Sequence, residues 1–250
     1  MSGLRLLVLG VGDAFSARYY SSCLALEAEG SWLLVDCPHP IRKILHEGGT
    51  AAGIDLDVTN ISAVALTHLH ADHCSGLEGL GFYSYFYLNR PVQLLVHPEV
   101  SARLWEGCLA AGMEWTMPGD SRVRGYLHDY FHLIPLSEAD RVTFGPFTIQ
   151  CRPTIHTIPT MAMLIWAGGR CFGYSSDTAY DDGLIDWLSQ ADLIVHETNL
   201  GIHTPYEKLA SLPEALRAKM RLIHYPDEFD SQASIIEPLR QGQCFGVAGS

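Results

Sequence analysis

Four residues that can bind a metal ion or move a proton lie within six positions of the 250-residue chain. His68, His70, Asp72 and His73 (HLHADH) follow the apolar run 61–66, which is typical of a buried strand. Unpaired polar groups buried at a strand end would cost several kcal/mol each, so a bound metal is the first candidate partner. Because residues two apart on an extended segment share a face, His68 and His70 can bind one ion together.

More His, Asp and Glu residues stand where other predicted strands end. His156 follows a strand at 147–152, Asp177 lies in the segment YSSDT after a hairpin, and His196-Glu197 and His224 close two short apolar runs. Loops at strand ends are where a rigid sheet presents a binding site. His68, His70 and one remote histidine would leave a coordination position open, as catalytic zinc sites do.

The pattern HxHxDH resembles the signature of the metallo-β-lactamase superfamily, and His156, Asp177 and His224 follow in the order of its remaining metal ligands. The opening LGVG with its serines, VDC at 35–37, YSSDT at 174–178 and HET at 196–198 resemble ribonuclease Z-like members. The resemblance extends from Leu4 to about His224. It implies an α/β fold, a four-layer αββα sandwich of two mixed β-sheets with helices outside, and one hydrolase domain over residues 1–250.

The resemblance also implies a role for each candidate residue. One ion would be held by His68, His70 and His156, a second by Asp72, His73 and His224, and Asp177 would bridge them. Asp72 would orient a bridging hydroxide or accept its proton, and His196, backed by Glu197, would face the scissile group as a proton donor or charge stabiliser. His39 and Ser175 are expected to contact substrate. Zinc is the expected metal, with manganese or iron as alternatives, because nitrogen and oxygen donors do not select one metal.

Hydrophobic periodicity predicts the elements that position these residues. Helices are predicted over 40–47, stopped by Gly48-Gly49, over 99–111 and over 182–190, and 206–219 is predicted as helical turns broken at Pro213. Strands alternate with these helices, which predicts sheets inside and helices outside. A loop at 115–124 is long enough to cover the cleft. Its Arg122 and Arg124 and the aromatic run 82–87 remain open as substrate contacts, dimer surface or core.

The substrate class follows from three features. Asp177 stands where lactamases of the superfamily often carry cysteine, which fits the phosphodiesterase, glyoxalase and lactonase branches. His156 and Asp177 are 21 positions apart, which leaves no room for the transfer-RNA-binding arm of ribonuclease Z. The net charge of −12 does not suit a nucleic-acid polymer.

We therefore expect a dinuclear metal-dependent phosphodiesterase that acts on a small or cyclic phosphodiester, such as a cyclic nucleotide or cyclic phosphate. Alternatives are a lactone, thioester or ester hydrolase, a tRNA 3′-processing endoribonuclease, which the missing arm and acidic charge disfavour, and a non-catalytic binding protein. Seven scattered cysteines without a CxxC pair predict a reducing, cytoplasmic location. Apolar segments fall short of the roughly 20 residues of a membrane span, and the resemblance implies a homodimer.

Overall fold

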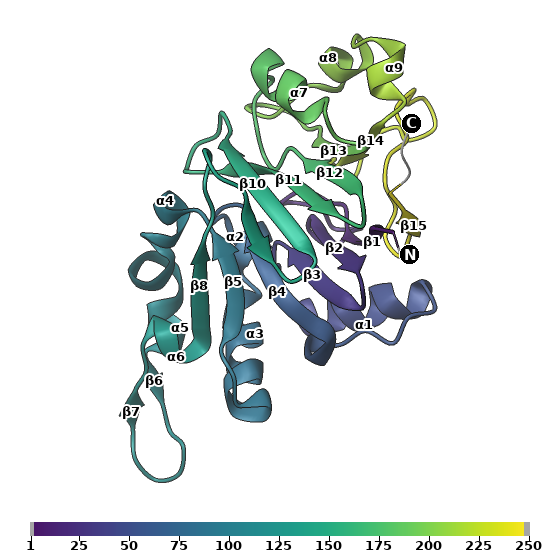
Figure 1. Cartoon of the computed structure of the whole chain (residues 1–250). Coiled ribbons are helices and arrows are strands. Elements are labelled where there is room, and N and C mark those ends of the chain that lie inside the picture. The colour runs from purple at the N-terminus through teal and green to yellow at the C-terminus, as the bar shows by residue number, and fades with distance from the viewer. Residues whose placement is uncertain (1–2, 248–250) are drawn as a thin grey trace.

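Two β-sheets form the centre of the molecule, and helices cover their outer faces (Figure 1). The computed structural model describes residues 3–247. Strands such as β2 (Cys23–Ala28) and β4 (Ile61–Leu66) are buried along almost their whole length. Continuous burial means that both faces of a strand are covered. The expected fold class, a mixed α/β sandwich with helices outside, is confirmed.

The first sheet has seven strands in the order β15-β1-β2-β3-β4-β5-β8. Besides β2 and β4 these are β1 (Arg5–Gly10), β3 (Ser31–Val35), β5 (Val92–Val96), β8 (Phe131–Pro135) and β15 (Cys244–Gly246). β3, β4, β5 and β8 run parallel, so their carboxyl ends meet at one edge. The HLHADH segment leaves from that edge. β15 was not predicted; it pairs with β1 and brings the C-terminal part of the chain back to the N-terminal strand.

The second sheet has six strands in the order β14-β13-β12-β11-β10-β9. They are β9 (Val142–Phe144), β10 (Phe147–Pro153), β11 (Met161–Ala167), β12 (Arg170–Tyr174), β13 (Leu193–Glu197) and β14 (Met220–Ile223). β12, β13 and β14 are parallel, while β10, β11 and β12 alternate in direction. The carboxyl ends of β10, β12, β13 and β14 therefore share one edge, which gathers the segments that carry the later His, Asp and Glu candidates.

The helix predicted over 40–47 is longer than expected. It forms α1 (Ile41–Ala51) and continues through the two glycines that were expected to stop it. Gly48 faces β1, where an added Cβ would lie 2.6 Å from Leu9 Cδ2. The glycine thus allows helix and strand to approach closely and does not end the helix. α3 (Leu77–Tyr83) follows the histidine loop and continues as the π-helix η2 (Ser84–Leu88).

The helix predicted over 99–111 is divided into three parts. They are α4 (Pro98–Ser101), the π-helical turn η3 (Trp105–Leu109) and α5 (Ala110–Met113). The remaining short helices are η1 (Val58–Asn60), α2 (Ala71–Cys74), α6 (Leu127–Tyr130), α7 (Asp182–Leu188), α8 (Tyr206–Ala210) and α9 (Glu214–Arg217). Pro213 separates α8 from α9, as predicted.

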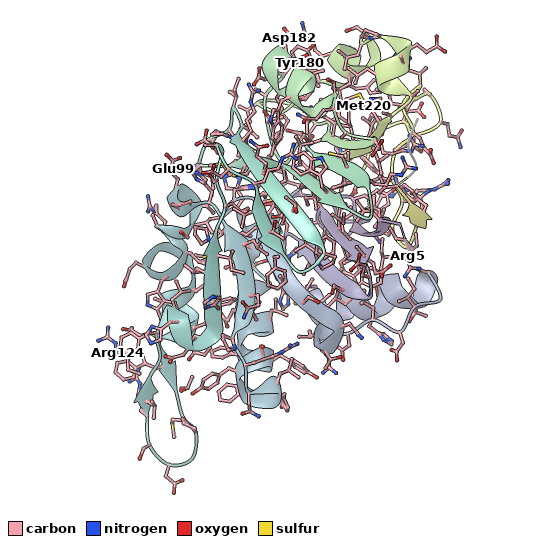
Figure 2. The ribbon with its side chains drawn as sticks, in the orientation of Figure 1. Arg5, Glu99, Arg124, Tyr180, Asp182 and Met220 are labelled. Carbon is pink, nitrogen blue, oxygen red and sulfur yellow. The ribbon has the colours of Figure 1, made fainter. Side chains whose placement is uncertain are left out.

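The segment 115–124, expected to cover the cleft, is a β-hairpin that projects away from the body (Figure 1). Its strands β6 (Trp115–Thr116) and β7 (Val123–Arg124) pair only with each other. The hairpin precedes α6 and the start of β8, so it lies at the sheet edge opposite to the histidine loop. Figure 2 shows Arg124 at the base of the hairpin. Arg124 forms an ion pair of 2.6 Å with Glu114. Arg122 stacks on Trp115, so neither arginine faces the cleft of its own chain.

None of the helices in the described part of the chain combines the length and the hydropathy that a membrane span needs.

Candidate metal centre

The loop that carries the first four candidates is held at its start by a buried carboxylate. β3 and β4 are parallel neighbours, so Asp36 after β3 and Thr67 after β4 lie side by side. The Thr67 amide and hydroxyl donate to Asp36 Oδ1 over 2.9 and 2.8 Å. Both residues are fully buried. The loop therefore leaves the sheet in a fixed direction.

Metal-ligating side chains gather in two adjacent groups. His68, His70, His156 and Asp177 offer donor atoms within 4.8 Å of one another, and so do Asp72, His73, Asp177 and His224. All seven residues expected to bind metal are thus brought together from both sheets, and the two groups share Asp177.

Asp177 lies between the two groups. Its Oδ2 is 3.7 Å from His68 Nε2, 3.8 Å from His156 Nε2 and 3.4 Å from His224 Nε2. Its Oδ1 is 3.3 Å from His73 Nε2. These distances are longer than hydrogen bonds, and the space between the atoms suits a cation that one carboxylate shares.

Buried polar atoms without a hydrogen-bond partner test whether the site fits a metal. Among residues 3–247, seven buried side-chain N or O atoms lack a partner, and five of them belong to this cluster: His68 Nε2, Asp72 Oδ2, His73 Nε2, His156 Nδ1 and Asp177 Oδ1. Leaving such atoms unsatisfied costs about 1–3 kcal/mol each. The concentration of these atoms in one place, with imidazole and carboxylate donors, fits a divalent metal centre.

The opposite ring nitrogens of three histidines are held by other side chains. His73 Nδ1 lies 2.8 Å from Asp36 Oδ2, His68 Nδ1 lies 2.9 Å from Thr67 Oγ1, and His224 Nδ1 lies 3.1 Å from Ser22 Oγ. Such contacts fix the tautomer and aim the other nitrogen at the metal. We did not assign these roles to Ser22, Asp36 and Thr67 from the sequence. A carboxylate at the end of an apolar strand was the available signal for Asp36.

Burial and neighbouring charges set the protonation of the donor atoms. Burial alone would lower the pKa of His73, but the carboxylates of Asp177 and Asp36 raise it well above its ordinary value. Burial lowers the pKa of the His68, His156 and His224 imidazoles, and that of His156 falls to about 4. Burial alone would raise the pKa of Asp177, but the nearby imidazoles of His73 and His224 hold it well below its ordinary value. Neutral imidazoles and an ionised carboxylate are the forms that bind metal, so binding of an ion would displace the proton of His73.

The histidine beside Glu197 at the metal centre is His203, which the sequence analysis did not select. His203 Nδ1 lies 2.9 Å from Glu197 Oε1, and its ring centroid lies 5.5 and 5.3 Å from those of His156 and His224. Glu197 is fully buried and also accepts the Thr178 amide at 2.7 Å. The loop after β13 brings His203 back to the site, a contact that no local motif indicates.

His196 does not occupy the expected position. Neighbouring residues on a strand point to opposite faces, so the Glu197 side chain that meets His203 leaves His196 on the other side of β13. His196 Nδ1 lies 2.7 Å from the Glu197 carbonyl oxygen, and burial lowers the pKa of His196 to about 4. The expected proton donor thus lies away from the two donor groups.

The two residues expected to contact substrate have different environments. Ser175 is fully buried; its hydroxyl donates to the Ser176 carbonyl at 2.7 Å and accepts the Glu197 amide at 2.9 Å. It joins β12 to β13 and is not exposed to a ligand. His39 is exposed, and its amide donates to Ser75 Oγ just after α2. Only His39 remains available for substrate contact.

The fold and the paired donor groups define a metal-dependent hydrolase of the metallo-β-lactamase fold. The structure is similar to that of the metallo-β-lactamase fold protein YhfI from Bacillus subtilis, with a TM-score of 0.76, 20% identity and coverage of 98% of this chain and 99% of the other. The short form of human tRNase Z gives a TM-score of 0.70, with 19% identity and coverage of 98% and 99%. The expected metallo-β-lactamase fold is confirmed.

Comparison of the amino-acid sequence with known families identifies the family of this chain. Residues 4–245 match the family described as anti-Pycsar protein Apyc1, and the chain belongs to that family. An anti-Pycsar protein Apyc1 from Bacillus phage 010DV004 is 30% identical over 262 residues, which cover 97% of this chain and 98% of the relative.

Proposed function

We propose that this protein is a dinuclear phosphodiesterase that hydrolyses a small cyclic phosphodiester, with a cyclic nucleotide as the favoured substrate. The observation that carries the proposal is the pair of donor groups that share Asp177, next to the His203–Glu197 pair. Two adjacent divalent ions suit phosphoryl transfer, because they stabilise both oxygens of an in-line displacement and lower the pKa of a coordinated water to about 7. Zinc is the favoured ion, with manganese or iron as alternatives.

The chain's own residues then have separate tasks. His68, His70 and His156 would hold one ion, Asp72, His73 and His224 would hold the second, and Asp177 belongs to both groups. Asp72 is positioned to accept a proton from the nucleophile, because its Oδ2 is buried in the site, without a hydrogen-bond partner among residues 3–247, and lies 3.2 Å from His73 Nε2.

His203 is the proposed proton donor to the leaving oxygen. Burial lowers the pKa of His203, but the hydrogen bond and charge of Glu197 outweigh burial and raise it above its ordinary value. Burial raises the pKa of Glu197 itself to about 7. A proton is therefore retained on this pair near neutral pH, where a general acid needs it.

The loops that leave the site line a cavity large enough for a nucleoside. Its volume is about 610 Å³, and Thr198, Pro205, Tyr206, Pro226 and Phe229 are among its lining residues. Thr198 directly follows Glu197, and Pro205 and Pro226 stand two positions after His203 and His224. The Tyr206 and Phe229 rings meet edge to face at 5.5 Å. Aromatic and apolar walls suit a base or another flat organic group.

A transfer-RNA substrate is disfavoured by the same fold. Between Pro153 and Asp177 the chain forms a short loop and the β11–β12 hairpin, without a protruding arm. Acidic residues Glu207, Glu228 and Asp230 line the cavity and would repel a polyanion. A small phosphodiester brings a single phosphate charge, which the metal ions neutralise.

A panel of hydrolysis assays tests the proposal. We expect the zinc-loaded protein to cleave cyclic nucleotides and bis-p-nitrophenyl phosphate, and the double variant His68→Ala/His70→Ala to lose at least about 10³-fold of this activity. Lactones, thioesters and esters are assayed in parallel under the same metal load. Turnover of those substrates with none of the phosphodiesters would reject the phosphodiesterase and establish the ester hydrolase.

Two further expectations belong to the proposal. We propose that two copies pair through the exposed apolar side chains of η2 and of the hairpin, namely Tyr87, Trp115, Met117 and Val123, because exposed apolar groups of this kind mark interaction sites. Light scattering measures the molar mass of the wild type and of Met117→Glu, and a monomeric wild type would contradict the pairing.

A cytoplasmic location is the second expectation, and the seven free cysteines support it.

A further inference from the structure

Two cysteine side chains meet directly behind the metal loop. Cys74 is the last residue of α2 and follows His73 in the chain. Cys108 lies in the π-helical turn η3, and its Sγ is 3.7 Å from Cys74 Sγ. The contact joins segments 34 residues apart. Both residues are free thiols in the structure.

The two thiols differ in their access to solvent. Cys74 is buried with 2% of its surface exposed, whereas Cys108 is only partly buried. A reagent in solution therefore reaches Cys108 first. The hydrogen bond from the Cys74 thiol lowers the pKa of Cys108 to about 7, and a thiolate is the form that oxidants attack.

We propose that Cys74 and Cys108 form a reversible disulfide that links the oxidation state of the protein to the geometry of its metal centre. Hydrogen peroxide is the class of oxidant. The Cys108 thiolate attacks one peroxide oxygen, the O–O bond breaks, and Cys108 becomes a sulfenic acid as hydroxide leaves. The Cys74 sulfur then attacks the Cys108 sulfur, the S–S bond forms, and the sulfenic oxygen leaves as water. Two thiols thus lose two electrons to one peroxide, and a dithiol reductant restores them.

Closure of this bond pulls on α2 and η3. The sulfur atoms have to approach from 3.7 Å to about 2.0 Å. α2 is one short turn that also carries Asp72 and His73. The Cys37 amide donates to the His73 carbonyl at 2.7 Å, and the His73 ring is hydrogen-bonded to Asp36. His73 therefore cannot move together with Cys74 without breaking these contacts. A shift of about 1 Å at a reacting group can cost 10²-fold in rate.

The experiment uses the zinc-loaded full chain, treated with hydrogen peroxide and then alkylated and digested without reduction. Mass spectrometry should find a peptide pair joined through Cys74 and Cys108. Hydrolysis of bis-p-nitrophenyl phosphate should fall roughly 10–100-fold and recover after reduction with a phosphine. Cys108→Ser should keep its activity through the same treatment. The matched control Cys244→Ser removes another partly buried thiol and should respond like the wild type.

Two outcomes overturn the proposal. One is the absence of the Cys74–Cys108 peptide at peroxide concentrations that oxidise Cys244 in the same sample. The other is a complete cross-link with unchanged hydrolysis and unchanged zinc content. Cys108→Ala replaces Cys108→Ser if the serine variant does not fold. Peptide mapping and zinc content do not depend on the substrate, so a failure here differs from a failure of the phosphodiesterase proposal.

Discussion

Substitution of His203 separates proton donation from the rest of the chemistry. A general acid matters when the leaving oxygen is a poor leaving group, as the ribose oxygen of a cyclic nucleotide is. It matters little for p-nitrophenolate, which leaves without a proton. We therefore expect His203→Ala to lower kcat for a cyclic nucleotide about 10²–10⁴-fold and to change hydrolysis of bis-p-nitrophenyl phosphate only slightly.

The variant Glu197→Gln measures how much the charge of Glu197 contributes to proton donation by His203. Glutamine has nearly the same shape, and its oxygen can still accept from His203 and from the Thr178 amide, which lie 2.9 and 2.7 Å from Glu197 Oε1. What is lost is the charge, and the difference between a charged and a neutral hydrogen bond is about 1–1.5 kcal/mol. Because 1.36 kcal/mol equals a factor of ten, kcat should fall roughly 5–15-fold.

The pH dependence of kcat tests the role of the Glu197 charge independently. The Glu197 carboxylate raises the pKa of His203, so its loss lowers that pKa and the acid form disappears at a lower pH. The alkaline limb of kcat for the cyclic nucleotide should therefore move to lower pH in Glu197→Gln. The aryl substrate should show no such movement in the same buffers.

His196→Asn is the control for this comparison, because His196 points away from the donor groups. The assay is the ratio of cyclic-nucleotide to aryl-phosphodiester turnover, which cancels losses of folded protein. We expect a normal ratio for His196→Asn and a collapsed ratio for His203→Ala. An equal fall on both substrates for His203→Ala, or a collapsed ratio for His196→Asn, would refute this assignment of the proton donor.

The remaining predictions concern the residues that support the centre. Asp36→Asn removes the charge that holds His73 Nδ1 and should weaken zinc binding about 10–100-fold in a competition with a chelating dye; unchanged affinity would contradict that role. Gly76→Ala would place a Cβ 2.4 Å from the Pro38 carbonyl oxygen, so urea unfolding should show a free energy of unfolding lower by about 1–3 kcal/mol. Wild-type stability of this variant would mean that the loop around Gly76 moves freely. Asp57→Asn tests the ion pair with Arg42, which lowers the pKa of Asp57. A lowered pKa stabilises the fold above the unfolded value of 3.8 and loses that effect as the pH falls through the folded value. The urea midpoint should therefore drop at pH 7 and match the wild type in strong acid, and a difference that persists in acid would exclude the ion pair as its cause.

The seven metal-site candidates could be predicted because each stands at or just after the end of an apolar run. Strand ends are legible in the sequence, and the parallel order of strands brings them to one edge. His203 could not be found in this way, because the turn of the loop after β13 places it and nothing in the spacing records that turn. Ser22 and Asp36 act through strand adjacency, which is a property of the sheet order.

Two expectations depended on local patterns in the sequence, and the structure places their residues away from the donor groups. The motif HET suggested that His196 and Glu197 act together, but the alternation of a strand separates their side chains. The segment 115–124 was expected near the cleft because of its length alone. Its direction depends on the start of β8, which lies at the far edge of the sheet. Similarly, Gly48 and Gly49 were read as a helix stop, although Gly48 permits close packing against Leu9.

Anomalous scattering from zinc-loaded crystals locates the metal ions directly. We expect two peaks about 3.5–4 Å apart, one among His68, His70 and His156 and the other among Asp72, His73 and His224, with Asp177 touching both. A single peak, or two peaks outside these groups, would contradict it.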